Sequence, residues 1–139
     1  MDGNQHKSQP AVEDLALLQA HTEKLMWPCL LFLLYRKPAH GYELIQNLNE
    51  MGLSEGEADP ATVYRNLRRL EEEHLVASHW ETGTAGPARR LYQLTPAGRR
   101  SLHVFARLLT EKKRQLEEFL HRYQEIIRAS SSGSEEEGD

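Results

Sequence analysis

Five arginines in two short clusters are the residues of this chain whose type and spacing best suit the binding of a ligand. Arg65, Arg68 and Arg69 lie within five residues of one another, and Arg89 and Arg90 are adjacent further along. A guanidinium presents a planar fork of donors that pairs with a phosphate, or with the edge of guanine, through two parallel hydrogen bonds. The clusters therefore indicate a surface that binds a polyanion, and a solvated helix face is the plain alternative.

The first cluster belongs to a helix that we predict over residues 60–73. Asp59 is a natural N-cap, and Pro60 suits a first helical position, where a missing N–H costs no hydrogen bond. Spacings of four and three predict an apolar stripe that packs on a core: Val63, Leu67 and Leu70. The opposite side is polar and basic, made of Thr62, Arg65, Arg68 and Arg69 and flanked by Tyr64 and Asn66.

The second cluster stands at the base of a predicted β-hairpin. Residues 75–81 and 89–94 have strand character, and in the second run Arg90, Tyr92 and Leu94 alternate with Leu91 and Gln93. The tip between them begins with TGTAGP, which is small and turn-forming and lets a backbone approach another polymer closely. Thr95 and Pro96 then begin a further helix as its N-cap and first-turn residue. An ordinary surface turn is the alternative for this hairpin.

A basic helix beside a basic hairpin is typical of a winged helix-turn-helix, which lays the helix in a DNA major groove and braces the hairpin on the adjacent backbone. Upstream, residues 30–34 predict a buried helix, and residues 38–48 predict a turn and a second helix. We therefore predict a mainly α fold with a small β-hairpin, in which a winged helix-turn-helix occupies residues 28–98.

Two further helices are predicted outside this unit, and both are expected to contact a second copy of the chain. Residues 12–27 form an amphipathic helix that Pro28 breaks or restarts, with Leu15, Leu18 and Leu25 on its apolar stripe. Over residues 99–128 the apolar positions recur every three or four residues, which is the period of a coiled coil. Its predicted dimerisation residues are Leu102, Phe105, Leu109, Leu116, Phe119 and Tyr123, with Lys112 as the one polar lapse. From Leu102 to Ile126 such a helix spans about 36 Å, too long for one small domain to cover.

The two ends of the chain are predicted to be disordered, over residues 1–11 and 129–139, because they are polar and cannot pack. The acidic residues of the C-terminal tail equal the net charge of −4: Glu135, Glu136, Glu137 and Asp139. The remaining 17 acidic and 17 basic residues balance, so the positive field of the arginine clusters is local rather than global.

Catalysis and metal binding find little support in the sequence. It has no Gly-rich phosphate loop, nucleophile motif, CxxC or HExxH, and the row of Glu117, His121 and Glu125 suits a solvated helix face. We therefore predict that the chain is not an enzyme and needs no cofactor or metal. Its single cysteine, Cys29, excludes a disulfide framework and favours the cytoplasm, and the apolar run over residues 29–34 is too short to span a membrane.

Three separated motifs resemble the PadR family of transcriptional regulators. They are HGYEL from His40, TVYRNLRRLEEEHLV from Thr62 and GPARRLYQLTPAG from Gly86. The last two also resemble the subgroup known as polyhydroxybutyrate-responsive repressors. The chain departs from the family pattern at His74, where many members have Gly, and at Asn66, where many have Pro.

The resemblance and the predicted seam together imply a homodimeric DNA-binding regulator, in the simplest case a repressor of a pseudo-palindromic operator that an effector releases. The predicted DNA-contacting residues are His40, Thr62, Tyr64, Arg65, Asn66, Arg68, Arg69, Thr84, Arg89 and Arg90, of which Thr62, Arg65 and Arg69 read bases. A small-molecule effector of unknown identity is a further expected partner, and Trp27 and Trp80 are its candidate contacts unless they belong to the core. Two alternatives stay open: a winged helix that binds an acidic protein, and a sensor that binds a ligand or polymer granule.

Overall fold

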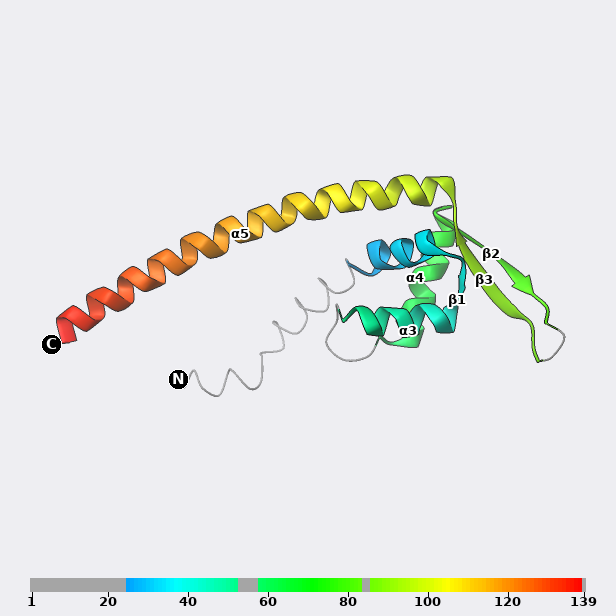
Figure 1. The fold of residues 1–139 in the computed structure, drawn as a ribbon, viewed down its shortest axis with the longest axis horizontal. Helices are drawn as coiled ribbons and strands as arrows, with labels where there is room; N and C mark the ends of the chain where they lie inside the picture. The colour runs from blue at the N-terminus through cyan, green and yellow to red at the C-terminus, as the bar shows by residue number, and fades with distance from the viewer. Residues whose placement is uncertain (1–24, 53–57, 84–85, 139) are drawn as a thin grey trace. The chain divides into compact units, whose positions relative to one another are not determined.

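The structure is a computed structural model that describes residues 25–52, 58–83 and 86–138 (Figure 1). A helix over residues 25–36 comes first. It is followed by β1 (Ala39–His40), α3 (Gly41–Met51), α4 (Pro60–Glu72), β2 (Val76–Glu81), β3 (Arg89–Leu94) and α5 (Pro96–Gly138). Helices with one small antiparallel sheet match the predicted mainly α fold, and β2 and β3 form the predicted hairpin. The chain divides into two units, Met1–Leu102 and His103–Asp139.

The sheet of the first unit has the order β1-β3-β2, and both pairings are antiparallel. Val76 pairs with Leu94 and Glu81 with Arg89 along the hairpin, while His40 of the short β1 pairs with Leu91. Figure 1 shows the hairpin projecting beyond the ends of the helices as a wing. Because β1 leads directly into α3, the sheet attaches the start of that helix to the wing.

The core of this unit lies between the helices and one face of the sheet. The predicted stripe of α4 is confirmed, because Val63, Leu67 and Leu70 are all fully buried. They meet fully buried residues from other elements: Leu30, Leu31, Leu44 and Val76. Burial of such side chains stabilises the fold by about 1.5–3 kcal/mol each. The packing leaves the opposite, arginine-bearing face of α4 in solvent.

Two glycines allow elements to approach one another closely. A Cβ added to Gly41, at the start of α3, would overlap the ring of Tyr64 on α4. A Cβ added to Gly98, in the first turn of α5, would overlap the backbone oxygen of Leu75, just before β2. The glycines of the HGY and TPAG motifs therefore serve helix–helix and helix–strand packing.

Two predicted boundaries of the elements are wrong. Pro28 lies inside the helix over residues 25–36 and does not break it, because Pro28 itself, Cys29, Leu30, Leu31, Leu33 and Leu34 are buried and hold the helix in the core. The last helix does not end at residue 128 but continues to Gly138. Serine lowers helix propensity by only tenths of a kcal/mol, and glutamate is a good helix former, so the tail sequence is compatible with a helix. The predicted segments 1–11 and 12–24 lie outside the described residues.

The second unit is the greater part of α5, which is a long, gently curved helix in Figure 1. Pairs of side chains three or four residues apart stabilise its surface: Arg114 with Glu111 at 2.7 Å, Arg122 with Glu118 at 2.6 Å, and His121 with Glu125 at 3.4 Å. Among the helices of the described ranges, none has a stretch long and apolar enough to cross a membrane.

Candidate nucleic-acid interface

Helix α4 begins with the cap that the sequence predicts. The Asp59 carboxylate accepts hydrogen bonds from the Thr62 backbone N–H at 3.1 Å and from the Thr62 hydroxyl at 2.8 Å. These two bonds hold the pKa of the Asp59 carboxyl below its ordinary value. The Thr62 hydroxyl proton is therefore used inside the chain, which leaves the methyl group and the oxygen lone pairs of Thr62 for contact with a ligand.

The basic face of α4 is free for a ligand. Arg65, Arg68 and Arg69 are exposed, and none of them forms a hydrogen bond or ion pair with a carboxylate of the described residues. Tyr64 lies beside them and is 41% exposed. Three unneutralised guanidiniums on one helix face create a local positive potential despite the net charge of −4.

Asn66 is not on this face, which corrects its predicted role as a DNA contact. Its side chain is 6% exposed, accepts a hydrogen bond from Trp27 Nε1 at 2.9 Å and donates one to the Thr62 carbonyl at 2.8 Å. The helical wheel places position 66 at the edge of the polar face. The helix over residues 25–36 covers that edge, so the amide is turned into the core.

The two wing arginines have different surroundings. Arg90 donates to Ser78 Oγ at 2.6 Å, lies 4.0 Å from the Glu71 carboxylate and stacks over Trp80 at 4.7 Å. Ser78 in turn donates to Glu71 at 2.8 Å, so this network joins both strands of the wing to α4. Arg90 therefore supports the wing, although it remains partly exposed.

Arg89 lies on the other side of its strand and is exposed. Its guanidinium stacks over the Tyr42 ring at 5.3 Å and donates to the Tyr42 hydroxyl at 3.1 Å. Neither contact neutralises the charge, because the phenol is uncharged. Arg89 therefore presents a positive charge that is held in place by an aromatic ring.

His40 is engaged within the chain rather than free for DNA. Its backbone N–H donates to Glu43 at 2.8 Å in a capping box at the start of α3, and that bond is the main reason that the pKa of Glu43 is lowered. Its ring nitrogens contact Glu43 at 3.2 Å and Glu81 of the wing at 2.9 Å, and the ring stacks on Tyr42. Two neighbouring carboxylates make this position unfavourable for a phosphate, so the predicted DNA contact of His40 is not supported.

A shallow pocket of about 340 Å³ lies between the start of α3, α4 and the wing. Its lining residues are His40, Gly41, Tyr42, Tyr64, Trp80, Ala88, Arg89, Arg90 and Tyr92. The rings of Tyr42, Tyr64 and Trp80 are 50%, 41% and 60% exposed, so aromatic and guanidinium groups are interleaved around one opening. Such groups suit the sugar and phosphate units of a nucleic-acid backbone.

Tyr42 and Trp80 line this pocket but were not among the nucleic-acid contacts predicted from the sequence. Tyr42 stands in the HGYEL motif, and Trp80 pairs with Arg90 across the hairpin. A search for aromatic residues opposite or near the arginines would have found both. Trp27 is hydrogen-bonded to Asn66 and does not line this pocket, and its role as an effector contact stays a prediction. Thr84 lies outside the described residues.

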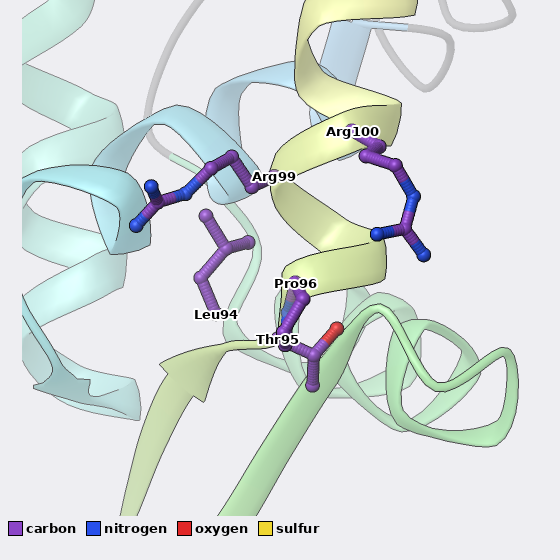
Figure 2. A pocket seen from close by; sticks show the side chains of 5 residues that line it. All are labelled: Leu94, Thr95, Pro96, Arg99 and Arg100. Carbon is purple, nitrogen blue, oxygen red and sulfur yellow. The ribbon is translucent and has the colours of Figure 1, made fainter.

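A second pocket lies where β3 passes into α5, lined by Leu94, Thr95, Pro96, Arg99 and Arg100. Figure 2 shows that the Arg99 and Arg100 side chains extend to opposite sides of the first turns of α5. Arg99 stacks over Tyr35 at 5.5 Å. Because the two guanidiniums do not converge, this pocket is less suited to an anion than the surface of α4 and the wing.

The predicted dimerisation residues fall into three groups. Leu15 and Leu18 lie outside the described residues, and Leu25, Leu102 and Phe105 are half-buried within the chain. The others are exposed apolar side chains of the second unit: Leu109, Leu116, Phe119 and Tyr123. Leu120 and Ile127, next to the predicted seam positions, are exposed as well and widen the apolar face. The dimer itself stays a prediction.

The chain matches one family model, described as the transcriptional regulator PadR-like family, over residues 30–104, which is more than half of its length. The chain belongs to this PadR-like family. This is a family of transcriptional regulators, which agrees with the prediction that the chain is not an enzyme. The matched region includes α3, α4, the wing and the first turns of α5.

Individual relatives agree with this membership. A transcriptional regulator of Mycobacterium tuberculosis is 40% identical over 79 residues, which cover 57% of this chain and 64% of that protein. The chain thus spans less than two thirds of the length of this relative. A PadR family transcriptional regulator from Eggerthella lenta has a similar structure, with a TM-score of 0.65 and 27% identity over 80% of this chain and 93% of that one.

The structure of Bacillus subtilis PadR in complex with operator DNA is also similar in fold. Its TM-score is 0.53 at 21% identity, and the match covers 59% of this chain and 45% of that one. At 21% identity this likeness shows a shared fold and nothing more.

Proposed function

We propose that this PadR-like chain is a sequence-specific DNA-binding repressor that acts as a homodimer on a pseudo-palindromic operator and is released by an effector. The observation that carries the proposal is the exposed row of Arg65, Arg68 and Arg69 on α4, none of which forms an ion pair with a described carboxylate. Family membership supports it, as does the operator complex of the Bacillus subtilis PadR.

The side chains divide into base readers and backbone contacts. A major groove is wide enough to admit α4, and an arginine at its floor pairs bidentately with guanine, so Arg65 and Arg69 are the base readers, assisted by Thr62. Arg68 and Tyr64 hold the backbone next to α4, and Arg89 holds it at the wing. The aromatic pocket between these elements would receive one sugar–phosphate unit, with Tyr42 and Trp80 against the sugar.

The homodimer supplies the second half of the operator contact. Exposed apolar side chains at heptad spacing along α5, among them Leu109 and Leu116, are expected to pack against their counterparts in a second copy. Two-fold symmetry would then place the two α4 helices in major grooves about 34 Å apart, which is one turn of the duplex. A change in the packing of α5 is the simplest way for an effector to alter that separation.

The proposal is tested by selecting duplexes from a random-sequence library with the full chain and then measuring Arg65→Ala on the selected and on a scrambled duplex. Loss of a bidentate base contact should cost about 1–3 kcal/mol on the selected duplex and much less on the scrambled one. Arg122→Ala, which removes an exposed charge from the middle of α5, is the control and should change neither affinity.

Equal losses on both duplexes would make Arg65 a backbone contact. Failure of the wild-type chain to enrich any duplex would favour a winged helix that binds an acidic protein instead. Duplex binding also has a steep salt dependence, because it releases counterions condensed on the DNA. A flat dependence of the affinity on salt concentration would therefore contradict DNA binding.

A further inference from the structure

Asn66 is the buried polar residue of the described core, and its hydrogen bond with Trp27 connects the helix over residues 25–36 to α4. Its Oδ1 accepts from Trp27 Nε1 at 2.9 Å, and its Nδ2 donates to the Thr62 carbonyl at 2.8 Å. Thr62 in turn donates twice to the Asp59 cap. A continuous row of hydrogen bonds thus runs from the helix over residues 25–36 to the first turn of α4.

This row of hydrogen bonds affects the orientation of α4 as well as its stability. Apolar packing is not directional, so the buried stripe of α4 resists separation from the core better than it resists a small rotation about the helix axis. A hydrogen bond weakens steeply when its angle or length changes, and an orphaned buried amide is costly. The Trp27–Asn66 bond therefore favours one rotation and one axial position of α4.

The position of Asn66 makes that choice relevant to the basic face. Asn66 follows Arg65 directly and stands three residues before Arg69, so a rotation of α4 that breaks the bond also turns both guanidiniums. A bidentate contact with guanine depends on the direction of the guanidinium plane. A contact with a phosphate tolerates a change of direction, because it depends mainly on charge.

We propose that Trp27 and Asn66 are positioning residues for base readout, which set the orientation of Arg65 and Arg69 without touching DNA. This inference rests on the function proposed above. It assigns part of the sequence preference to a hydrogen-bonded pair that is not part of the exposed basic face.

The test uses three variants of the full chain, Trp27→Phe, Asn66→Leu and the double variant, with Phe32→Leu as control. Phe32 is an exposed aromatic residue of the same helix. Each variant is measured on the selected duplex, on the scrambled duplex and over a range of salt concentrations. Hydrogen exchange of the α4 backbone amides is measured without DNA, and unfolding temperature is measured in parallel.

Trp27→Phe should lower the ratio of selected to scrambled affinity by about threefold to tenfold, the value of one hydrogen bond. Affinity for the scrambled duplex and the salt slope should stay unchanged, because no phosphate contact is lost. Exchange of the α4 amides should become several-fold faster. Phe32→Leu should change none of these quantities.

The double variant separates positioning from stability. Replacing both partners with apolar groups leaves no orphaned polar pair, so the unfolding temperature should return toward that of the wild type. The affinity ratio should nevertheless stay reduced, because nothing directional holds α4. Recovery of the ratio together with stability would show that the pair is only structural and would overturn the inference.

The exchange experiment keeps this inference distinguishable from the proposed function. A wild-type chain without preference for any duplex would contradict the function and, with it, the assignment to base readout. A wild-type chain that prefers its selected duplex, combined with an unchanged ratio in Trp27→Phe, would overturn the positioning role alone. Unchanged α4 exchange in Trp27→Phe would overturn that role whatever the DNA measurements show.

Discussion

At the scale of single residues, His74 is notable for its backbone. It is the non-glycine residue with a positive φ among those described, 62°, and it directly follows Glu73, the C-cap of α4. The conformation lets the His74 and Leu75 N–H groups bond back to the carbonyls of Glu71 and Leu70, at 3.0 and 2.9 Å. Glycine adopts this conformation without the steric cost of a Cβ.

We therefore expect His74→Gly to raise the free energy of unfolding by about 1 kcal/mol, the cost of a left-handed conformation in a residue with a Cβ. Urea denaturation of the two proteins measures the difference. Glu73→Gly is the matched control, since Glu73 has a φ of −86° and gains nothing from glycine. It should be neutral or destabilising, and a stabilised Glu73→Gly would show that the conformation is not the cause.

Gly98 has a different role, because it is needed for space rather than for an unusual φ. We expect Gly98→Ala to lower the free energy of unfolding by about 1–3 kcal/mol, since the new methyl group would overlap the immovable backbone oxygen of Leu75. Gly133→Ala on α5 is the control: nothing lies within 4 Å of a Cβ there, and alanine is the better helix former. Thermal unfolding of both variants measures the difference. A Gly98→Ala variant as stable as the wild type would contradict the close packing of α5 on Leu75.

At the scale of elements, strand β3 of the wing gives two neighbouring arginines different roles. Side chains of a strand alternate between its faces, so Arg89 and Arg90 point to opposite sides of β3. Arg90 meets Glu71, Ser78 and Trp80, while Arg89 meets Tyr42 and solvent. The wing is thus joined to α4 through one arginine and presents its charge through the other.

Arg89→Ala is expected to weaken binding to every duplex and to reduce the slope of log affinity against log salt by about one charge. Arg90→Ala should reduce the slope less and should lower the unfolding temperature instead, because its guanidinium holds the wing to α4. Titrations at several salt concentrations, with unfolding curves of both variants, separate the two effects. Identical slopes and stabilities for the two variants would contradict this division.

At the scale of the whole molecule, the two units differ in how their apolar side chains are covered. In the unit Met1–Leu102, the apolar stripes of the described elements are buried in a common core. In the unit His103–Asp139, a row of large apolar side chains along α5 remains exposed, including Phe119 at 62% and Ile126 at 65%. A regular row of that length is typical of a helix that packs on a second helix.

Replacing both Leu109 and Leu116 with Asp tests whether this row is a dimer seam. Unpaired carboxylates in an apolar interface cost on the order of several kcal/mol, so the dimer should dissociate, and affinity for the selected duplex should collapse although no residue of α4 or the wing has changed. Sedimentation beside the wild type measures the association.

The control places the same two charges on the polar side of the helix, as Thr110→Asp and Gln124→Asp, both exposed positions. It should remain dimeric and bind the selected duplex. A dimeric Leu109→Asp, Leu116→Asp variant that still binds would show that α5 does not join the two copies.

The sequence by itself determined the features that depend on neighbours a few residues away. The Asp59 cap, the buried stripe of Val63, Leu67 and Leu70, the strand over residues 89–94 and the start of α5 at Pro96 all follow from local geometry, and the structure confirms them. Capping and periodicity act within one or two turns, so a short window of sequence contains their causes.

Only the tertiary structure decided which residues at the edge of a polar face point into the core. Asn66 stands at the edge of a polar face, and its burial depends on Trp27, which is 39 residues away in the chain. Alternation along β3 separates Arg89 from Arg90, but the face that meets Glu71 is chosen by the packing of the wing on α4. Helical and strand periods specify the angle between side chains on one element. Which of these side chains become buried depends on the other elements, because burial is a property of the assembled core.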